Sequence, residues 1–580
     1  MEAVGAGKVQ PFPLRLSDKK RSNLCRFRPV SKRVWGRWIA KASSHTLRLR
    51  SPTRPWRFAR DALRCTRTLE IDMGTAAAIN PNAKLPADIQ PPLHMGSHHP
   101  QRKRVLFVTS EFSDLIKCGG LGDVSAALPR ALAPQHDIRL LIPGYRQVVE
   151  SGWPIRIVGH VRGLAALPPC RIGRMDLADG LIVYVLLNPV LYERDGTPYG
   201  DAQSQDWPDN HIRFARLGLA AAEIATGDAG IQWRPDLVHA NDWPASMAPA
   251  YMAWRGATAP ALLTIHNLAY QGLCDMACSS ELAIPEEACG IDGMEFHGRL
   301  SFLKAGISYA HHVTTVSRTY AQEITTPAFG CGLEGMLQAK VAAGQLSGIV
   351  NGIDESWNPE TDPHLLQGFA PRQWEGKRAN AAYVEQWLGL EAEGPLFAVI
   401  SRLVQQKGID LTLEVAEHIV AQGGRIGAIG RGEPALEAAM AQLAQRYPGR
   451  IGVHIGFNET DARRLYAASD FLLMPSRFEP CGLSQIYAQR FASLPIARRT
   501  GGLADTIEDG VSGFLFDEPD AASYRAAIDR ALQVYRHREL FDAMRCHAMH
   551  APLYWRQSVR PYDRLYQRLL ARSSARREQR

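Results

Sequence analysis

Short apolar runs alternate with helical patterns along the chain from Arg104 onward. In the first half, the runs with the length of buried parallel strands are residues 105–109, 181–187, 236–239, 261–265 and 312–316. Apolar positions at helical spacing lie between them, for example over residues 212–224. The alternation predicts a doubly wound α/β domain.

A second set of runs begins near Ile349. Its candidate strands are residues 397–400, 426–429, 451–455, 471–474 and 495–497, again with helical patterns between them, and residues 554–570 have the pattern of a closing helix. We therefore predict two Rossmann-like, doubly wound α/β domains that face a cleft. The expected boundaries are 101–345 for the first domain, 346–555 for the second, and 556–580 for the closing helix and a basic tail. Ligands bind such sheets beyond the carboxyl ends of the strands.

Residues 1–100 have no such periodicity. Residues 1–70 hold 18 of the 67 Lys and Arg residues but only 4 of the 58 Asp and Glu residues, so the net charge of +9 comes from this segment. A disordered basic extension is expected. Three interpretations stay open: an organellar transit peptide, a basic arm that binds nucleic acid, or sequence upstream of a true start at Met73 or Met95.

Composition limits which classes of protein and which cellular locations fit the chain. No run of 18 apolar residues is present, so we expect no membrane partner. The ten cysteines are scattered, and only Cys274 and Cys278 are close, without a histidine at zinc-site spacing. Reduced thiols, no metal site and a cytoplasmic location are expected, with a plastid as the alternative if residues 1–100 are a transit peptide.

The loop after the run at residues 471–474 carries the most informative chemistry. Glu479 and Cys481 lie between that run and a helical pattern formed by Leu483, Ile486, Tyr487, Phe491 and Leu494. A helix start offers free N–H groups and a positive dipole end, which suit a phosphate, and a carboxylate there can accept hydrogen bonds from sugar hydroxyls. Alternatively, Glu479 merely caps the loop and Cys481 is a small buried residue.

Other polar groups follow predicted strands in both halves. Lys117 precedes Gly119 and Gly120, an arrangement that lets backbone N–H groups approach a phosphate but is not a Walker loop. Residues 239–243 and 264–267 end two strands with His-Ala-Asn-Asp-Trp and Thr-Ile-His-Asn, although a single histidine there is more often structural. Arg402 and Lys407 can flank a diphosphate or simply form a solvated loop, and residues 500–505 repeat the glycine pair.

These motifs, in this order and spacing, resemble bacterial glycogen synthases and plant starch synthases over about residues 104–570. The resemblance implies the GT-B arrangement, ADP-glucose as donor, an α-1,4-glucan (glycogen or starch) as acceptor, retention of configuration, and neither a cofactor nor nucleic acid as a partner. It implies catalytic roles for Glu479, His266, Arg402 and Lys407. It implies substrate contacts for Lys117, Gly119, Gly120, Asp242, Asn267, Phe457, Cys481, Gly482 and Leu483.

The chain departs from the family pattern at three positions. Cys118 stands where the family usually has Thr or Val, and Phe457 stands at an adenine position that is more often Tyr. Phe457 keeps the stacking face and loses a hydroxyl. Tyr487 occupies the place, eight residues after Glu479, where many related transferases have a second Glu.

A single motif carboxylate argues against the two-carboxylate chemistry of retaining glycosidases. We expect front-face transfer, in which the leaving phosphate oxygen helps to deprotonate the acceptor, and cationic side chains in place of Mg²⁺. The alternatives are a UDP-glucose-dependent transferase of the same fold, a glucan phosphorylase, which would need a lysine-bound pyridoxal phosphate, and a non-enzymatic protein that binds glucan or nucleic acid.

Overall fold

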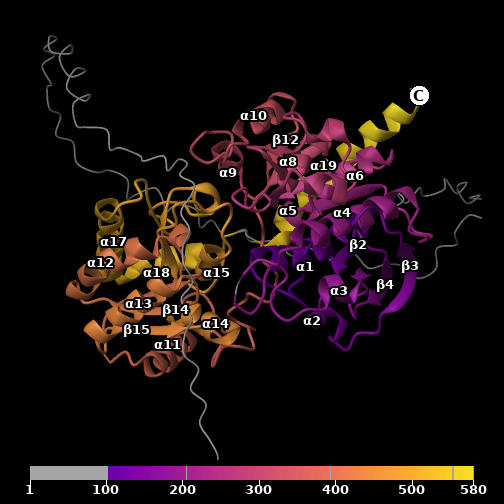
Figure 1. The fold of residues 1–580 in the computed structure, drawn as a ribbon. Helices are drawn as coiled ribbons and strands as arrows, with labels where there is room; N and C mark the ends of the chain where they lie inside the picture. Colours follow the sequence, from indigo (N-terminus) through magenta and orange to yellow (C-terminus); the bar gives the residue numbers. More distant parts are fainter. Residues whose placement is uncertain (1–101, 204, 392, 552–553, 579–580) are drawn as a thin grey trace, which may run out of the picture. The chain divides into compact units, whose positions relative to one another are not determined.

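The computed structural model describes residues 102–578 apart from 204, 392, 552 and 553, and side chains to residue 573. The interpretations offered for residues 1–100 lie outside the described residues. Two parallel-stranded sheets with helices on their faces organise the described chain, which confirms the predicted fold class (Figure 1). Among the described residues, no helix combines the length and apolar character needed to cross a bilayer.

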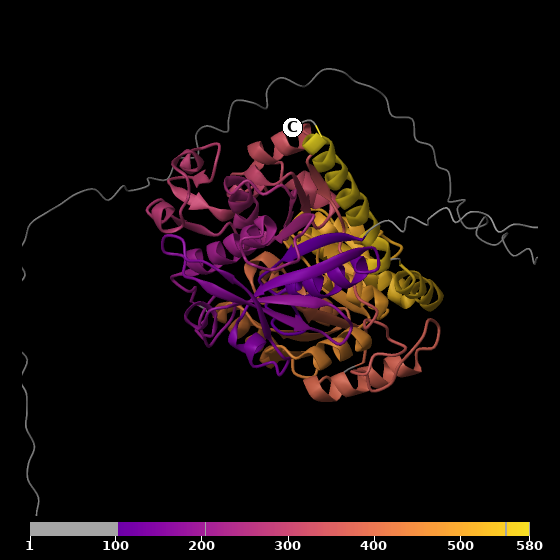
Figure 2. The same cartoon turned by 90° about the vertical axis from the view of Figure 1, so that its right-hand side faces the viewer.

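The first sheet has nine strands in the order β12-β11-β7-β6-β1-β2-β5-β4-β3. Its pairings are parallel except those of β3 with β4 and β4 with β5. Figure 2 shows its purple strands fanning out, the twist usual for such sheets. The strands are β1 (Lys103–Val108), β2 (His136–Pro143), β3 (Arg156–Val161), β4 (Cys170–Asp176), β5 (Ile182–Leu187), β6 (Leu237–Asn241), β7 (Ala261–Ile265), β11 (His312–Thr315) and β12 (Leu346–Gly348).

Helices and one small sheet accompany this first sheet. The helices are α1 (Gly120–Leu132), α2 (Arg146–Val149), α3 (Pro189–Tyr192), α4 (Asn210–Thr226), α5 (Asp242–Ala245), α6 (Met247–Trp254), α7 (Cys278–Glu281), α8 (Phe302–Tyr309), α9 (Arg318–Glu323) and α10 (Glu334–Ala342), with a 3-10 turn at Glu286–Cys289. The small sheet pairs β8 (Leu273–Asp275), β10 (Arg299–Ser301) and β9 (Glu295–Phe296) in antiparallel fashion.

The second sheet has six parallel strands in the order β15-β14-β13-β16-β17-β18, which is the Rossmann order 3-2-1-4-5-6. The strands are β13 (Leu396–Ile400), β14 (Arg425–Gly430), β15 (Ile451–Ile455), β16 (Phe471–Met474), β17 (Leu494–Arg498) and β18 (Phe514–Phe516). The helices of the second sheet are α11 (Glu375–Leu388), α12 (Ile409–Ala421), α13 (Pro434–Arg446), α14 (Glu459–Ala468), α15 (Ser484–Arg490), α16 (Gly501–Thr506), α17 (Ala521–Arg536) and α18 (Arg538–Met549), with a 3-10 turn at Gln405–Lys407, and α19 (Trp555–Glu578) follows them.

The last helix belongs to the core of the first sheet, not of the second. Trp555, Val559, Tyr562 and Tyr566 of α19 are buried in the same hydrophobic cluster as β1 and β6. Two separate clusters fill the two faces of the second sheet. The chain therefore crosses from the second sheet back to the first at its end.

One predicted helix differs from the structure. The apolar spacing extends to Leu494, but α15 ends at Arg490, and Leu494 instead begins β17. Ala492 takes a left-handed φ of 56°, which an L-residue adopts at some cost and which stops the helix. The pattern continued past this point because a buried helix and the buried strand after it are both apolar.

Candidate active site

The switch point of the second sheet lies between β13 and β16, because the strand order reverses there. The loop after β13 contributes Lys407 and the loop after β16 contributes Glu479. The Lys407 Nζ lies 2.6 Å from Glu479 Oε2, and the Ser476 hydroxyl donates to the same oxygen at 3.0 Å. The Glu479 side chain is only 6% exposed. A buried carboxylate with a cationic partner and a hydroxyl donor is held in one orientation.

A glutamine links the two loops of this switch point. The Gln406 side-chain amide donates to the Phe478 carbonyl at 3.2 Å, and the Gln406 carbonyl accepts from the Arg477 N–H at 2.8 Å. Arg402 is exposed, with Nη2 3.3 Å from Gln406 Oε1. The two cations of the expected pair thus differ in environment: Lys407 is mostly buried and paired with Glu479, and Arg402 is exposed.

The residues after Glu479 turn the chain into α15. Cys481 is buried, and burial raises the pKa of its thiol to about 12, so the thiol is neutral. Gly482 has a φ of +69°, and a Cβ there would lie 2.4 Å from Gln485 Oε1, so only glycine fits. Leu483 is the residue before the helix and is partly exposed.

The second glycine pair, Gly501 and Gly502, packs behind Glu479. A Cβ on Gly501 would lie 1.9 Å from the Glu479 carbonyl oxygen, and the Gly502 N–H donates to that oxygen at 3.0 Å. Here the glycines allow two backbones to approach closely. Their geometry accounts for the sequence motif through packing on the loop that carries Glu479.

In the first sheet, a carboxylate that the motifs did not single out organises the Lys117 loop. Glu111 Oε2 accepts from the N–H groups of Cys118 at 2.7 Å and Gly119 at 2.9 Å, and its Oε1 accepts from the Tyr199 hydroxyl at 2.6 Å. Burial raises the pKa of Glu111. The Gly119 amide is therefore already bonded, and the start of α1 at Gly120 supplies the next N–H groups, which have no partner within the helix.

Lys117 itself is partly exposed and paired. Its Nζ lies 2.8 Å from the Asp123 carboxylate on α1, and the Lys117 side chain is 38% exposed. Such a pair, open to water, contributes little to stability, so Lys117 can exchange partners when an anion arrives. The neighbouring residue Cys118 is exposed as a whole, but its sulfur is partly buried. This burial and the nearby Glu111 carboxylate raise the pKa of the thiol to about 12.

The ends of β6 and β7 bring Asp242 and His266 together. Asp242 Oδ1 accepts from the N–H groups of His266 at 3.2 Å and Asn267 at 3.4 Å, and His266 Nε2 lies 3.1 Å from Asn241 Oδ1. Burial raises the pKa of Asp242 to about 7 and lowers the pKa of His266 to about 3. His266 is therefore a neutral hydrogen-bonding group near neutral pH, and Asp242 titrates there.

His239, in the same motif as Asp242, is structural. It is fully buried, its Nδ1 lies 2.7 Å from the Tyr566 hydroxyl on α19, and its Nε2 lies 2.6 Å from the Thr264 hydroxyl. Burial lowers its pKa to about 3. The histidine connects the closing helix to β6 and β7.

Two contacts connect the loops of the two sheets. The Ser317 hydroxyl donates to the Pro480 carbonyl at 2.6 Å, next to Glu479. A Cβ on Gly120 would lie 3.7 Å from a methyl of Leu483, so the starts of α1 and α15 approach each other. Phe457, after β15, is 66% exposed and free to stack on a ligand.

Sequence reasoning missed Glu111, Tyr199 and Ser317. The sequence could have indicated Glu111, because it stands three residues after the end of β1. Polar groups in the same position after other strands are among the predicted site residues. Tyr199 and Ser317 reach the site only through the tertiary fold, and no local pattern marks them.

Family models and solved relatives match this arrangement. Residues 104–339 match the model described as "Starch synthase catalytic domain", and residues 385–543 match "Glycosyl transferases group 1". Glycogen synthase from Pseudomonas paraeruginosa is 65% identical over 479 residues, which are 82% of this chain and 93% of that protein. Glycogen synthase from Pseudomonas putida is 66% identical over 474 residues, 82% of this chain and 91% of that protein.

Solved structures of glycosyltransferases also resemble this chain. The catalytic domain of starch synthase IV from Arabidopsis thaliana, solved with ADP and acarbose, has a TM-score of 0.72 at 30% identity, covering 81% of this chain and all of that one. Sucrose-phosphate synthase from Thermosynechococcus elongatus has a TM-score of 0.50 at 17% identity and shows the fold alone.

Proposed function

The chain belongs to the glycogen synthase family and is a glycosyltransferase, and from this premise we propose that it transfers glucose from ADP-glucose to the non-reducing end of an α-1,4-glucan with retention of configuration. The observation that carries the proposal is the Lys407–Glu479 pair at the switch point of the second sheet, with exposed Arg402 in the same loop. We place the reaction in the cytoplasm.

The proposed donor position follows the chemistry of these groups. The diphosphate lies near Arg402, Lys407 and Lys117, which supply positive charge, and near the start of α1 at Gly120. The adenine stacks on Phe457, whose ring is exposed. The starch synthase IV relative was solved with ADP, which supports an adenine nucleotide over a uridine nucleotide.

The glucose lies between Glu479 and the His266 loop. Glu479 Oε2 is already bonded to Lys407 and Ser476, which supports a positioning and charge-stabilising role for this carboxylate. Neutral His266 and the Asn267 side chain then bond sugar hydroxyls, with Asp242 holding the two backbone N–H groups behind them.

The proposed chemistry is front-face transfer. The bond from C1 of glucose to the phosphate oxygen breaks while the bond from C1 to the acceptor oxygen forms on the same face. The acceptor proton passes to the leaving phosphate oxygen, and ADP departs. Arg402 and Lys407 stabilise the charge that develops on the diphosphate, an effect that is often the largest in such sites.

A donor competition assay tests the proposal. The purified chain, with glycogen as acceptor, should transfer glucose from ADP-glucose far faster than from UDP-glucose when both are present at equal concentration. Phe457→Ala should weaken ADP-glucose use without reversing the preference. Equal or reversed preference in the unaltered chain would contradict the donor assignment, and linkage analysis of the product checks the α-1,4 bond.

A further inference from the structure

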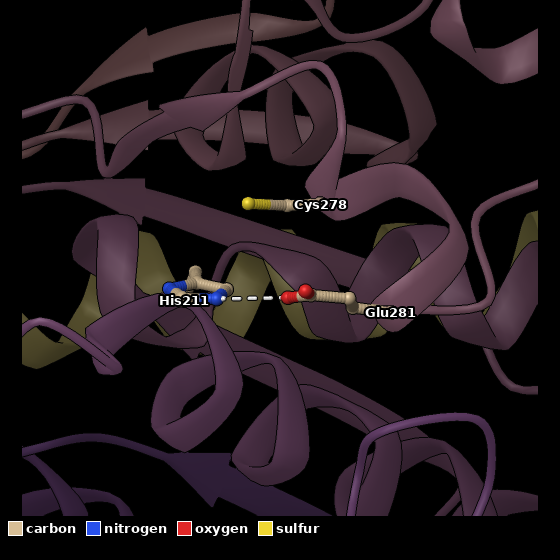
Figure 3. Close-up of side chains that lie close together, drawn as sticks. All are labelled: His211, Cys278 and Glu281. Carbon is tan, nitrogen blue, oxygen red and sulfur yellow. Dashed lines mark hydrogen bonds and ion pairs between the residues drawn. The ribbon is translucent and has the colours of Figure 1, made fainter.

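A histidine, a cysteine and a glutamate converge away from the site described above. His211 stands in the first turn of α4, while Cys278 and Glu281 begin and end α7 (Figure 3). One donor atom from each lies within 4.8 Å of the others, and His211 Nε2 lies 3.2 Å from Glu281 Oε2. Residues three apart on a helical turn share a face, which is why Cys278 and Glu281 both reach His211.

We propose that His211, Cys278 and Glu281 bind a zinc ion, with solvent as the fourth ligand. Imidazole nitrogen, thiolate sulfur and carboxylate oxygen are all zinc ligands, whereas Mg²⁺ and Ca²⁺ take oxygen only. Zinc bond lengths of about 2.0–2.3 Å place tetrahedral ligand atoms about 3.5 Å apart, so the cluster needs to contract by only about 1 Å. This departs from the sequence-based expectation of no metal site.

The backbone around the three side chains is already fixed. The Ala166 N–H donates to the Glu281 carbonyl at 2.9 Å, and the buried Tyr251 hydroxyl donates to the Leu282 carbonyl at 2.7 Å. Cys278 packs against the core of the first sheet. A site on anchored elements loses less entropy when it binds an ion than one on free loops.

The open fourth position follows from exposure. The Glu281 side chain is 51% exposed and that of His211 is 21% exposed, so water reaches the cluster. Cys274 lies close enough to Cys278 to hydrogen-bond through its thiol, yet it is not within 4.8 Å of all three donor atoms. We therefore assign it as a neighbouring thiol and not as a ligand.

An ion here would fasten α7 to α4. The α7 turn follows β8, and Gly272, just before β8, packs so closely on Trp243 that a Cβ would lie 2.3 Å from its ring. The chain from His266 to Glu281 is thus fixed at Gly272 by packing and at Glu281 by backbone hydrogen bonding, and the metal would add a side-chain link between α7 and α4. The predicted role is structural.

Cobalt titration of the full chain tests the proposal, because Co²⁺ replaces Zn²⁺ and reports thiolate ligation in its spectrum. After chelator treatment under a phosphine reductant, one equivalent of Co²⁺ should give a thiolate-to-cobalt charge-transfer band that Zn²⁺ abolishes. Cys278→Ser should lose the band. His211→Ala and Glu281→Ala should each weaken Co²⁺ binding by at least about 100-fold. Residues that only hydrogen-bond to a metal ligand typically change the affinity by less than this. Cys289→Ser, a change in the same segment, should bind like the unaltered chain.

Other results would overturn the assignment. A charge-transfer band retained in Cys278→Ser, or lost in Cys274→Ser, would show a different ligand set. Alkylation followed by mass spectrometry gives a second readout in the unaltered chain: Zn²⁺ should slow modification of Cys278 and leave exposed Cys331 unaffected. Equal rates with and without Zn²⁺ would exclude the site, and far-ultraviolet circular dichroism confirms that each variant is folded.

Discussion

Lys407 and Glu479 form an ion pair at 2.6 Å although 72 positions separate them in the chain. The two loops that carry them flank the point where the second sheet reverses its strand order. The pair therefore exists only in the completed sheet. It fixes the carboxylate that the motif indicated and leaves Arg402 as the exposed cation beside it.

Removal of either cation tests the electrostatic assignment. Arg402→Ala and Lys407→Ala should each lower kcat by about 10²–10³, the scale of losing one strong transition-state donor. Arg446→Ala, which breaks an exposed ion pair with Glu417, is the matched control and should leave kcat unchanged. Steady-state kinetics with saturating donor measures the effect, and a loss below tenfold in both site variants would contradict it.

Glu479→Gln separates positioning from nucleophilic catalysis. The variant keeps the shape of the side chain and loses the charge that Lys407 faces, so kcat should fall severely while the protein stays folded. Azide added to this variant should give no β-linked glucosyl azide, because front-face transfer forms no glucosyl-enzyme. A β-linked azide product would instead identify a covalent nucleophile. Near-normal turnover of Glu479→Gln would show that Glu479 is not part of the active site.

Glu111→Ala tests the carboxylate beneath the Lys117 loop. Without it the amides of Cys118 and Gly119 lose their acceptor, and the loop that carries Lys117 is less well fixed. We expect kcat/KM for the donor to fall by about 10–100-fold, from the loss of the two hydrogen bonds that hold the loop. Glu150→Ala, an exposed change in the same domain, is the control, and unchanged donor kinetics in Glu111→Ala would refute the role.

Asp242 predicts a pH dependence of stability with a defined sign. Its pKa is about 7 in the fold against an ordinary value near 4, so between about pH 4 and 7 the folded state holds a proton that the unfolded state has released. Stability contributed by this proton is lost as pH rises through that window. Asp242→Asn, which tolerates the left-handed φ of 58°, should flatten the dependence of the denaturation midpoint on pH. If the denaturation midpoint depended on pH in the same way in Asp242→Asn and in the unaltered chain, the raised pKa of Asp242 would be contradicted.

Residues 1–101 should be dispensable for catalysis. The family match begins at residue 104, and the charge of residues 1–70 contrasts with that of the rest. A chain that starts at Arg102 should keep most of its specific activity in the glycogen assay. Loss of most of kcat would show that the segment contributes to the reaction, and mass spectrometry of the native N-terminus would show which form exists in the cell.

The sequence predicted which polar groups lie in the loops after the strands, because each such loop is one stretch of chain, and their roles in a site stay predictions. Strand-loop-helix patterns located Glu479, Lys407 and the Lys117 loop, because ligand groups follow parallel strands at their carboxyl ends. The strand-end pattern alone did not separate His239 from His266, and it was the family resemblance that singled out His266. The hydrogen bond of buried His239 to Tyr566 shows that His239 is structural. His211 and Cys278 were not connected, because 67 positions divide them and the fold alone brings them together.

The return of α19 to the first sheet has a consequence for biosynthesis. Tyr562 and Tyr566 fill the core that begins at β1, so the first domain to be synthesised cannot complete its interior until the end of the chain has left the ribosome. The cores of the second sheet are complete at Tyr554, just before α19 begins. We expect the second domain to reach its native packing first, while the first waits with apolar surface exposed, the state in which a nascent chain needs chaperones most.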